Sequence, residues 1–165
     1  MSENKRAAPA GKKAAGRQGR TDWRHVLIVL AVALAVRFVY LAQISDNPFF
    51  QHPIIDAQTY DEMAVNIAAG REPIPAPYFQ PPLYPYFLGL LYALFGRDLL
   101  LVRLLQMALG ALNAWLLYRI GGRLFGRGTA LAAALAFGLY GPMLFYEGEL
   151  LAPVLIVMLN LLLAL

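Results

Sequence analysis

Apolar residues fill four long stretches of this 165-residue chain, and polar segments separate them. The first stretch, residues 26–44, is interrupted only by Arg37. At ~1.5 Å per residue, a helix of this length crosses a hydrocarbon core ~30 Å thick. Similar runs cover about 98–118, 129–146 and 150–165. The pattern predicts an all-α fold, a polytopic membrane bundle with four spanning helices.

A fifth apolar run, 84–95, is shorter, because only ten residues lie between Pro85 and Gly96. Ten residues make ~15 Å of helix, about half a bilayer. If this run spanned, the acid-free loop with Arg119, Arg123 and Arg127 would face outward, against the positive-inside rule. We therefore expect 84–95 to be an aromatic helix lying at the outer membrane surface, with the three arginines in the cytoplasm.

This topology leaves residues 45–97 as one extracytoplasmic loop. A loop of this length without structure of its own is uncommon, so interfacial helices are expected within it. Besides 84–95, an amphipathic pattern predicts a helix at about 57–69, with Gly70 as its C′ residue. The loop is acidic where the inner segments are basic; its charged residues, with Asp98 at its border, are Asp46, Asp56, Asp61, Glu62, Glu72 and Asp98 against Arg71 and Arg97.

Composition agrees with a membrane protein. Hydrophobic residues make up 59 % of the chain and charged residues 15 %, whereas soluble domains average about 45–50 % and about 25 %. The chain has no cysteine, which excludes a disulfide framework and a thiolate metal site. Residues 1–24 are basic and poor in apolar side chains, so we expect a disordered cytoplasmic tail that determines topology rather than one that binds nucleic acid or anionic lipid. Because the chain stops inside an apolar run, we expect it to be the N-terminal part of a longer protein and inactive alone.

Asp56 is the most informative acid in the outer loop. It precedes the expected helix and could serve as its N-cap. Thr59 and Glu62 also match a capping box, which would leave Asp56 available for chemistry. Asp61 and Glu62 are expected on the solvated face of the helix.

Four further charges lie near the expected outer surface. Glu147 and Glu149 flank the third and fourth spans, and such a carboxylate could orient another group, bind a cation or hold a sugar hydroxyl. Arg37 and Arg103 lie inside apolar spans near their outer ends. They could extend to the surface, pair with an acid such as Asp98, or bind phosphate with two parallel hydrogen bonds. A lone His52 is a weak metal signal, so no metal ligand is assigned, although a divalent cation is compatible with these acids.

The order of these features resembles a known family. Asp56 with Tyr60 is followed by QPPLYP at residues 80–85, a basic turn at 119–128, and then Glu147 or Glu149. This order resembles the GT-C glycosyltransferases, in particular bacterial members of glycosyltransferase family 39 related to protein O-mannosyltransferases and the lipid A aminoarabinose transferase. The resemblance covers residues 26–165, the N-terminal part of such a membrane domain.

The resemblance implies transfer of a sugar from a polyprenyl-phosphate donor to a hydroxyl of a glycan, lipid or protein at the outer face of a bacterial inner membrane. Asp56 matches the catalytic aspartate of the family and would act as the general base. Arg37 or Arg103 would lie near the leaving phosphate. Tyr60, Gln80 and Glu149, or else Glu147, are the other expected substrate contacts.

Two functions other than sugar transfer explain the same residues less well. A lipid-linked-sugar flippase or transporter should place ionisable groups near the bilayer midplane, often on broken helices. Here the acids gather in the outer loop, which favours surface chemistry. A non-catalytic membrane scaffold would leave the acidic loop and its aromatic helix without a purpose.

Overall fold

The structure is a computed structural model that describes residues 22–71 and 80–165; most of the basic tail, and Glu72, lie outside these residues. The described residues form helices and no strand, which confirms the predicted all-α class. The helices are α1 (Trp23–Ile44), the short 3-10 helix η1 (Pro48–Phe50), α2 (Ile55–Ala68), α3 (Leu83–Phe95), α4 (Leu99–Leu124), α5 (Arg127–Gly138), α6 (Gly141–Gly148) and α7 (Pro153–Ala164).

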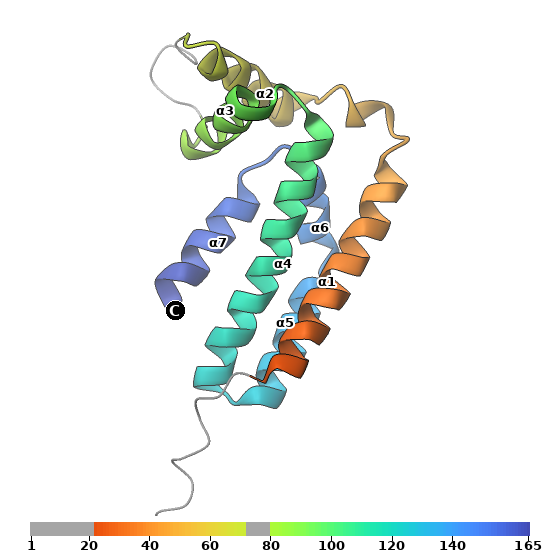
Figure 1. Ribbon diagram of the computed structural model, residues 1–165, viewed down its shortest axis with the longest axis vertical. Helices are drawn as coiled ribbons and strands as arrows, with labels where there is room; N and C mark the ends of the chain where they lie inside the picture. Colours follow the sequence, from red (N-terminus) through yellow and green to blue (C-terminus); the bar gives the residue numbers. More distant parts are fainter. Residues whose placement is uncertain (1–21, 72–79) are drawn as a thin grey trace, which may run out of the picture.

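Helix α4 is the centre of the bundle. It packs against α1, α5, α6 and α7, while α2 and α3 lie side by side across one end of the bundle (Figure 1). We call this the hairpin end, and we call the opposite end, where α4 meets α5, the basic end. The α2–α3 pair is close because Gly89 has no side chain: a Cβ there would lie 2.6 Å from Cγ2 of Ile67. Helix α2 closes as predicted, with Gly70 at a φ of 69° just after the C-cap Ala69.

Two described helices, α1 and α4, are long and apolar enough to cross a membrane, and α5 with α6 makes a third candidate if the pair counts as one span. The expected span 129–146 is thus two helices bent by 49° rather than one. Pro142 explains the break, because it cannot donate a hydrogen bond to Gly138 and its ring opposes helix continuation. The expected fourth span corresponds to α7, a shorter apolar helix of 12 residues.

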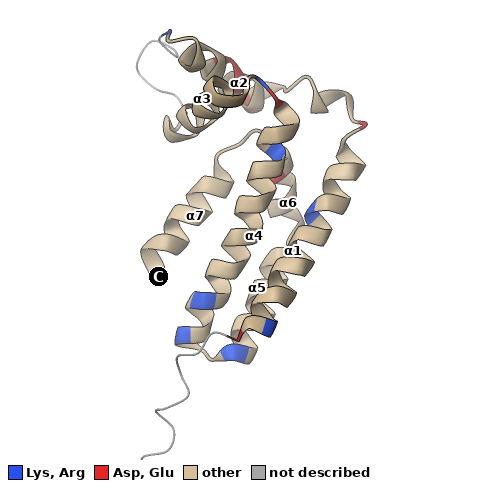
Figure 2. Cartoon of the chain, viewed as in Figure 1, with Lys and Arg blue, Asp and Glu red and all other residues tan. Residues whose placement is uncertain are grey.

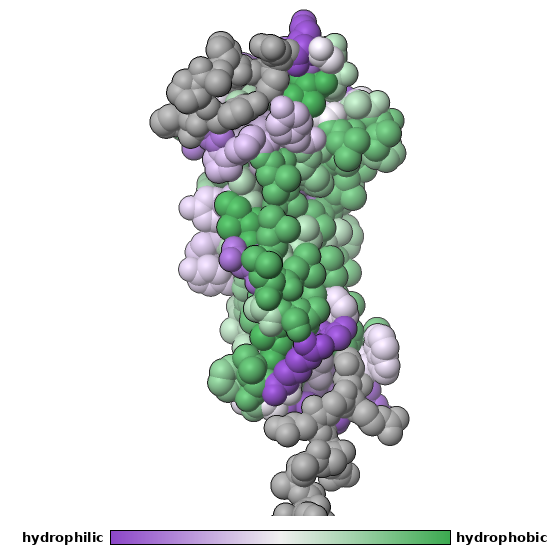
Figure 3. Space-filling view, turned by 90° about the vertical axis from the view of Figure 1, so that its left-hand side faces the viewer, coloured by the Kyte–Doolittle hydropathy of each residue, from purple (hydrophilic) through white to green (hydrophobic). Residues whose placement is uncertain are grey.

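The two ends of the bundle differ in charge. Four arginines, Arg24, Arg119, Arg123 and Arg127, lie at the basic end, where the α1 cap Asp22 is the one described acid. The other described acids lie toward the hairpin end, together with the remaining four described arginines (Figure 2). One face shows a broad apolar band between hydrophilic ends (Figure 3). Helices α2 and α3 cover the ranges expected for interfacial helices; their place in a membrane, and which end faces the cytoplasm, stay predictions.

Candidate functional site

Asp56 lies in the first turn of α2 with its side chain exposed. Its Oδ1 accepts a hydrogen bond of 3.0 Å from Nε2 of Gln80. Gln80 begins the QPPLYP segment that leads into α3, so this bond joins the start of α2 to the start of α3. The sequence named both residues as site candidates, and the structure brings them together.

Neither predicted cap of α2 is correct. The helix begins at Ile55 with Ile54 as N-cap, and no side chain makes a cap hydrogen bond. The hydroxyl of Thr59 instead donates to the carbonyl of Ile55, one turn back, at 3.3 Å. Ile55 has a φ of 55°, a strained conformation for a β-branched residue. Asp56 is therefore not used for capping, and a strained residue precedes it.

Tyr60 lies one turn after Asp56 and points into the hairpin. Its ring packs edge-to-face against Tyr84, with 4.9 Å between ring centroids. Burial raises the pKa of Tyr60, and the carboxylate of Asp56 raises it further. Tyr60 is buried, so its ring links α2 to α3 and is not an open surface for a ligand.

The prediction that Asp61 is solvated is wrong. Its side chain is buried and accepts a hydrogen bond of 2.6 Å from the hydroxyl of Tyr92. Arg97 donates to both carboxylate oxygens, through Nε and Nη2, at 2.7–3.1 Å. Burial and the bond to Asp61 raise the pKa of Tyr92 far above its ordinary value. Asp61 therefore fastens α2 to the end of α3, whereas the neighbouring Glu62 is exposed as predicted.

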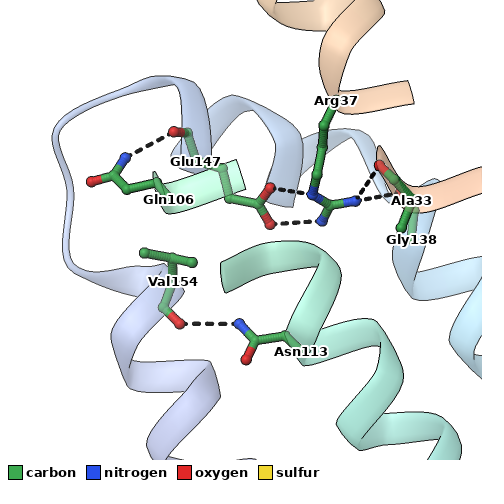
Figure 4. A network of polar contacts seen from close by, with 7 residues as sticks. All are labelled: Ala33, Arg37, Gln106, Asn113, Gly138, Glu147 and Val154. Carbon is green, nitrogen blue, oxygen red and sulfur yellow. Dashed lines mark hydrogen bonds and ion pairs between the residues drawn. The ribbon is translucent and has the colours of Figure 1, made fainter. Parts of the chain in front are cut away.

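Arg37 and Glu147 form a buried ion pair between α1 and α6 (Figure 4). Nε and Nη2 of Arg37 donate to the two carboxylate oxygens at 2.7 and 2.8 Å. Nη1 donates to the carbonyls of Ala33 and Gly138 at 3.1 and 3.2 Å. The Gly138 carbonyl is the one that Pro142 leaves without a helical donor. Arg37 thus donates the hydrogen bond that the Gly138 carbonyl lacks at the break between α5 and α6, and it also pairs with Glu147. Neither the Arg37 nor the Glu147 side chain reaches solvent.

Gly110 of α4 makes room for this ion pair. A Cβ at Gly110 would lie 2.1–2.4 Å from the carboxylate atoms of Glu147, much closer than two nonbonded atoms can approach. A larger residue at position 110 would therefore displace the carboxylate. The carboxylate cannot easily move away, because Arg37 holds both of its oxygens. The sequence prediction named the two charges separately and missed both their pairing and the glycine that permits it.

Arg103 and Glu149 form the second charged group at the hairpin end. The guanidinium of Arg103 lies 4.0 Å from the ring centroid of Phe50, and its Nε donates to the carbonyl of Gly148 at 2.7 Å. Glu149, in the turn between α6 and α7, is half-buried. Burial raises the pKa of its carboxyl, and the positive charge of Arg103 lowers it. Asp98 pairs with neither Arg37 nor Arg103. It caps α4 instead, by accepting hydrogen bonds from the backbone amides of Leu100 and Leu101.

Arg103 was singled out from the sequence, but the row of residues on α4 to which it belongs was not. Arg103, Gln106, Gly110 and Asn113 follow one another at spacings of three and four residues, so they share one helix face. Each meets α6, α7 or the turn between them. Asn113 donates to the carbonyl of Val154 in α7 at 3.1 Å (Figure 4). Polar residues at this spacing in an apolar helix are the sequence signal that could have found the row.

No three metal-binding side chains of His, Asp or Glu gather within residues 22–71 and 80–165. His52 is exposed, at the end of η1. The structure therefore offers no assembled ligand set for the divalent cation that the sequence allows.

A helical bundle with spanning apolar helices and an exposed carboxylate at one end defines a membrane-embedded class of protein. A family model described as dolichyl-phosphate-mannose-protein mannosyltransferase matches residues 79–165, more than half of the chain. The chain therefore belongs to this family of membrane glycosyltransferases, which agrees with the predicted GT-C resemblance; the bacterial subgroup stays a prediction. No curated protein and no solved structure matches the chain.

Proposed function

We propose that the chain belongs to an enzyme that transfers a sugar from a polyprenyl-phosphate carrier to an acceptor hydroxyl at the extracytoplasmic face, with Asp56 as general base. The observation that carries the proposal is the hydrogen bond between Asp56 and Gln80. It attaches an exposed carboxylate to the first residues of the segment that matches the glycosyltransferase family.

The proposed reaction is a single inverting displacement. The acceptor oxygen attacks the anomeric carbon while its proton passes to the carboxylate of Asp56. The bond between that carbon and the phosphate oxygen breaks, and the electron pair leaves with the polyprenyl phosphate. Gln80 binds Oδ1 of Asp56, and Oδ2 accepts none of the described hydrogen bonds. We therefore assign Oδ2 as the atom that accepts the proton of the acceptor hydroxyl.

Arg103 is the better of the two predicted phosphate ligands. Arg37 has both Nε and Nη2 committed to the carboxylate of Glu147. Arg103 is as buried as Arg37, but its Nε and Nη1 bond only to the backbone carbonyls of Gly148 and Leu99, and no carboxylate of the described residues lies within hydrogen-bond distance of it. It lies at the same end of the bundle as Glu149, which we assign to the sugar hydroxyls, in preference to Glu147.

The test is sugar transfer by the full-length protein carrying Asp56→Asn. The substitution keeps the shape of the side chain and its bond to Gln80 but removes the base, and losses of about 10²–10⁴-fold in kcat are typical of such a change. Glu62→Gln is the matched control, because Glu62 is an exposed acid on the same helix. The assay follows a labelled sugar from a polyprenyl-phosphate donor to acceptor.

Wild-type turnover by Asp56→Asn would overturn the role of Asp56. Movement of the donor across vesicles without any transfer would favour a flippase instead. Arg127→Cys and Asp56→Cys, probed with a membrane-impermeant thiol reagent, test the orientation. Residues 1–165 contain no cysteine, so once any cysteine elsewhere in the full-length protein is replaced, each label reports one site.

A further inference from the structure

Two side chains of α4 donate hydrogen bonds to three consecutive backbone carbonyls, at the end of α6 and the start of the turn that leads to α7. Nε2 of Gln106 donates to the carbonyls of Glu147 and Glu149 at 2.8 and 2.7 Å. Nε of Arg103 donates to the carbonyl of Gly148 between them, at 2.7 Å. Gln106 and Arg103 are both buried, so these bonds form away from the surface, where an unpaired carbonyl is costly.

The sequence explains why these carbonyls need side-chain donors. Helix α6 ends at Gly148, so its last carbonyls have no helical partner. Glu149, the C-cap of α6, has an extended backbone and lies outside both helices, so its carbonyl takes part in no helical hydrogen bond. That carbonyl accepts from Leu151 at 3.0 Å and from Gln106. Gln106 thus supplies a side-chain donor where the helical backbone provides none.

Tyr84 sets the orientation of the Gln106 amide. Its hydroxyl donates to Oε1 of Gln106, and this leaves Nε2 directed at the two carbonyls. Tyr84 belongs to the QPPLYP segment, and its ring packs on Tyr60, one turn after Asp56. A continuous path of contacts therefore runs from the α2 helix of the proposed base to the turn that carries Glu149.

The opposite side of the turn is held by α1. A Cβ at Gly148 would lie 2.7 Å from Cε1 of Tyr40, so the backbone of the turn lies directly against that ring. With α4 side chains on its carbonyls and a ring of α1 against its glycine, the turn has little freedom to shift. Glu149 is the carboxylate that this arrangement leaves half-open.

We propose that Gln106 is a positioning residue that fixes Glu149 in the transfer site, with its amide held in register by the Tyr84 hydroxyl. The proposal rests on the proposed function in taking Glu149 as a substrate-binding acid. It predicts that the QPPLYP segment acts on the reaction through Gln106 as well as through the bond from Gln80 to Asp56.

The geometric test is the reactivity of a single cysteine at position 149, in a full-length background from which any cysteine outside residues 1–165 has been removed. In full-length protein in membranes, Glu149→Cys is labelled with an impermeant maleimide, alone and combined with Gln106→Met or Tyr84→Phe. We expect labelling to accelerate several-fold in both combinations, because the turn loses its donors or their orientation. Asn113→Leu is the matched control, since Asn113 is also a buried α4 amide but binds a carbonyl of α7; it should leave the labelling rate unchanged. Equal rates with and without Gln106→Met would overturn the proposal.

The functional test is a double-mutant cycle on kcat. Losing hydrogen bonds worth ~1 kcal/mol each should lower kcat about thirtyfold in Gln106→Met, which loses two donated bonds, and about fivefold in Tyr84→Phe, which loses one. Tyr86→Phe, two residues along and exposed, should have no effect. In a Glu149→Gln background the same substitutions should add almost nothing, whereas a purely structural role predicts the full loss again and would overturn the proposal.

The two tests separate this proposal from the proposed function. If Glu149→Gln alone kept wild-type transfer, the substrate role of Glu149 would be wrong, yet faster labelling in Gln106→Met would still support the positioning of the turn. If transfer depended on Glu149 but labelling did not respond to Gln106, the function would stand and the positioning role would be lost.

Discussion

Two carboxylates of this protein, Glu147 and Asp56, are held in opposite ways. Glu147 is buried and has both oxygens on Arg37. Asp56 is exposed and has one described hydrogen bond, from the neutral amide of Gln80. A buried carboxylate with both oxygens on a guanidinium is closed to a substrate hydroxyl. The comparison indicates that Glu147 builds the bundle, whereas Asp56 is kept available.

The cost of burial explains the difference. An ion removed from water loses several kcal/mol of solvation, which only a well-placed partner offsets. Arg37 meets that demand with four donated bonds, to Glu147, Ala33 and Gly138. Asp56 keeps its solvation and needs no such partner. Under the proposed function, stability and chemistry therefore rest on different acids of the same bundle.

The largest effect should come from Glu147→Ala. It leaves the buried guanidinium of Arg37 without its counter-charge, a change that typically costs about 3–5 kcal/mol. Asp56→Ala is the matched control, because an exposed carboxylate contributes little to stability. Thermal unfolding in detergent micelles should show a large loss for Glu147→Ala and almost none for Asp56→Ala. Equal melting of the two variants would contradict the contrast drawn above.

A smaller loss is expected from Gly110→Ala. The added methyl group would lie within 2.1–2.4 Å of the Glu147 carboxylate and must displace it from Arg37. Overpacking of this kind costs about 1–3 kcal/mol. Gly128→Ala provides the control, since a Cβ at Gly128 meets no atom within 4 Å. The measurement is again the unfolding midpoint in micelles; a neutral Gly110→Ala would mean that the ion pair can shift without loss.

The apolar pattern predicted most of the fold, because a membrane helix must be long and apolar wherever it lies. Helices α1 and α4 follow directly from it, and so does the brevity of α3. The bend between α5 and α6 was missed, although Pro142 was visible, because Gly138 and Gly141 beside it still read as part of one apolar run.

The site was predicted less well, because partners far apart in the chain cannot be read from spacing. Arg37 and Glu147 were each singled out, but their pairing depends on the bend at Pro142 and the notch at Gly110. Asp61 was placed on the wet face because its partners, Tyr92 and Arg97, come from another helix and the link after it.

The smallest effect concerns the pH dependence of transfer. Burial raises the pKa of Glu149 above its ordinary value of 4.5, and Arg103 lowers it. The folded protein therefore binds this proton more tightly than the unfolded chain does. The contribution of Glu149 to stability is greatest below pH 4.5 and decreases as the pH rises through the folded pKa. If the ionised carboxylate holds the sugar, the acid limb of kcat should lie above the range of an ordinary glutamate.

Arg103→Gln sharpens this last prediction. Without the guanidinium, burial acts alone, so the acid limb should move to higher pH, while Glu149→Gln should remove it. The hydroxyl of Tyr84 also faces Glu149, but burial raises the pKa of Tyr84 well above 10, so it stays neutral across the acid limb. Tyr86→Phe serves as the control with an unchanged profile. An acid limb that survives Glu149→Gln would assign it to another group, with Asp56 the first to examine, because Asp56 is the proposed general base and its carboxylate is exposed.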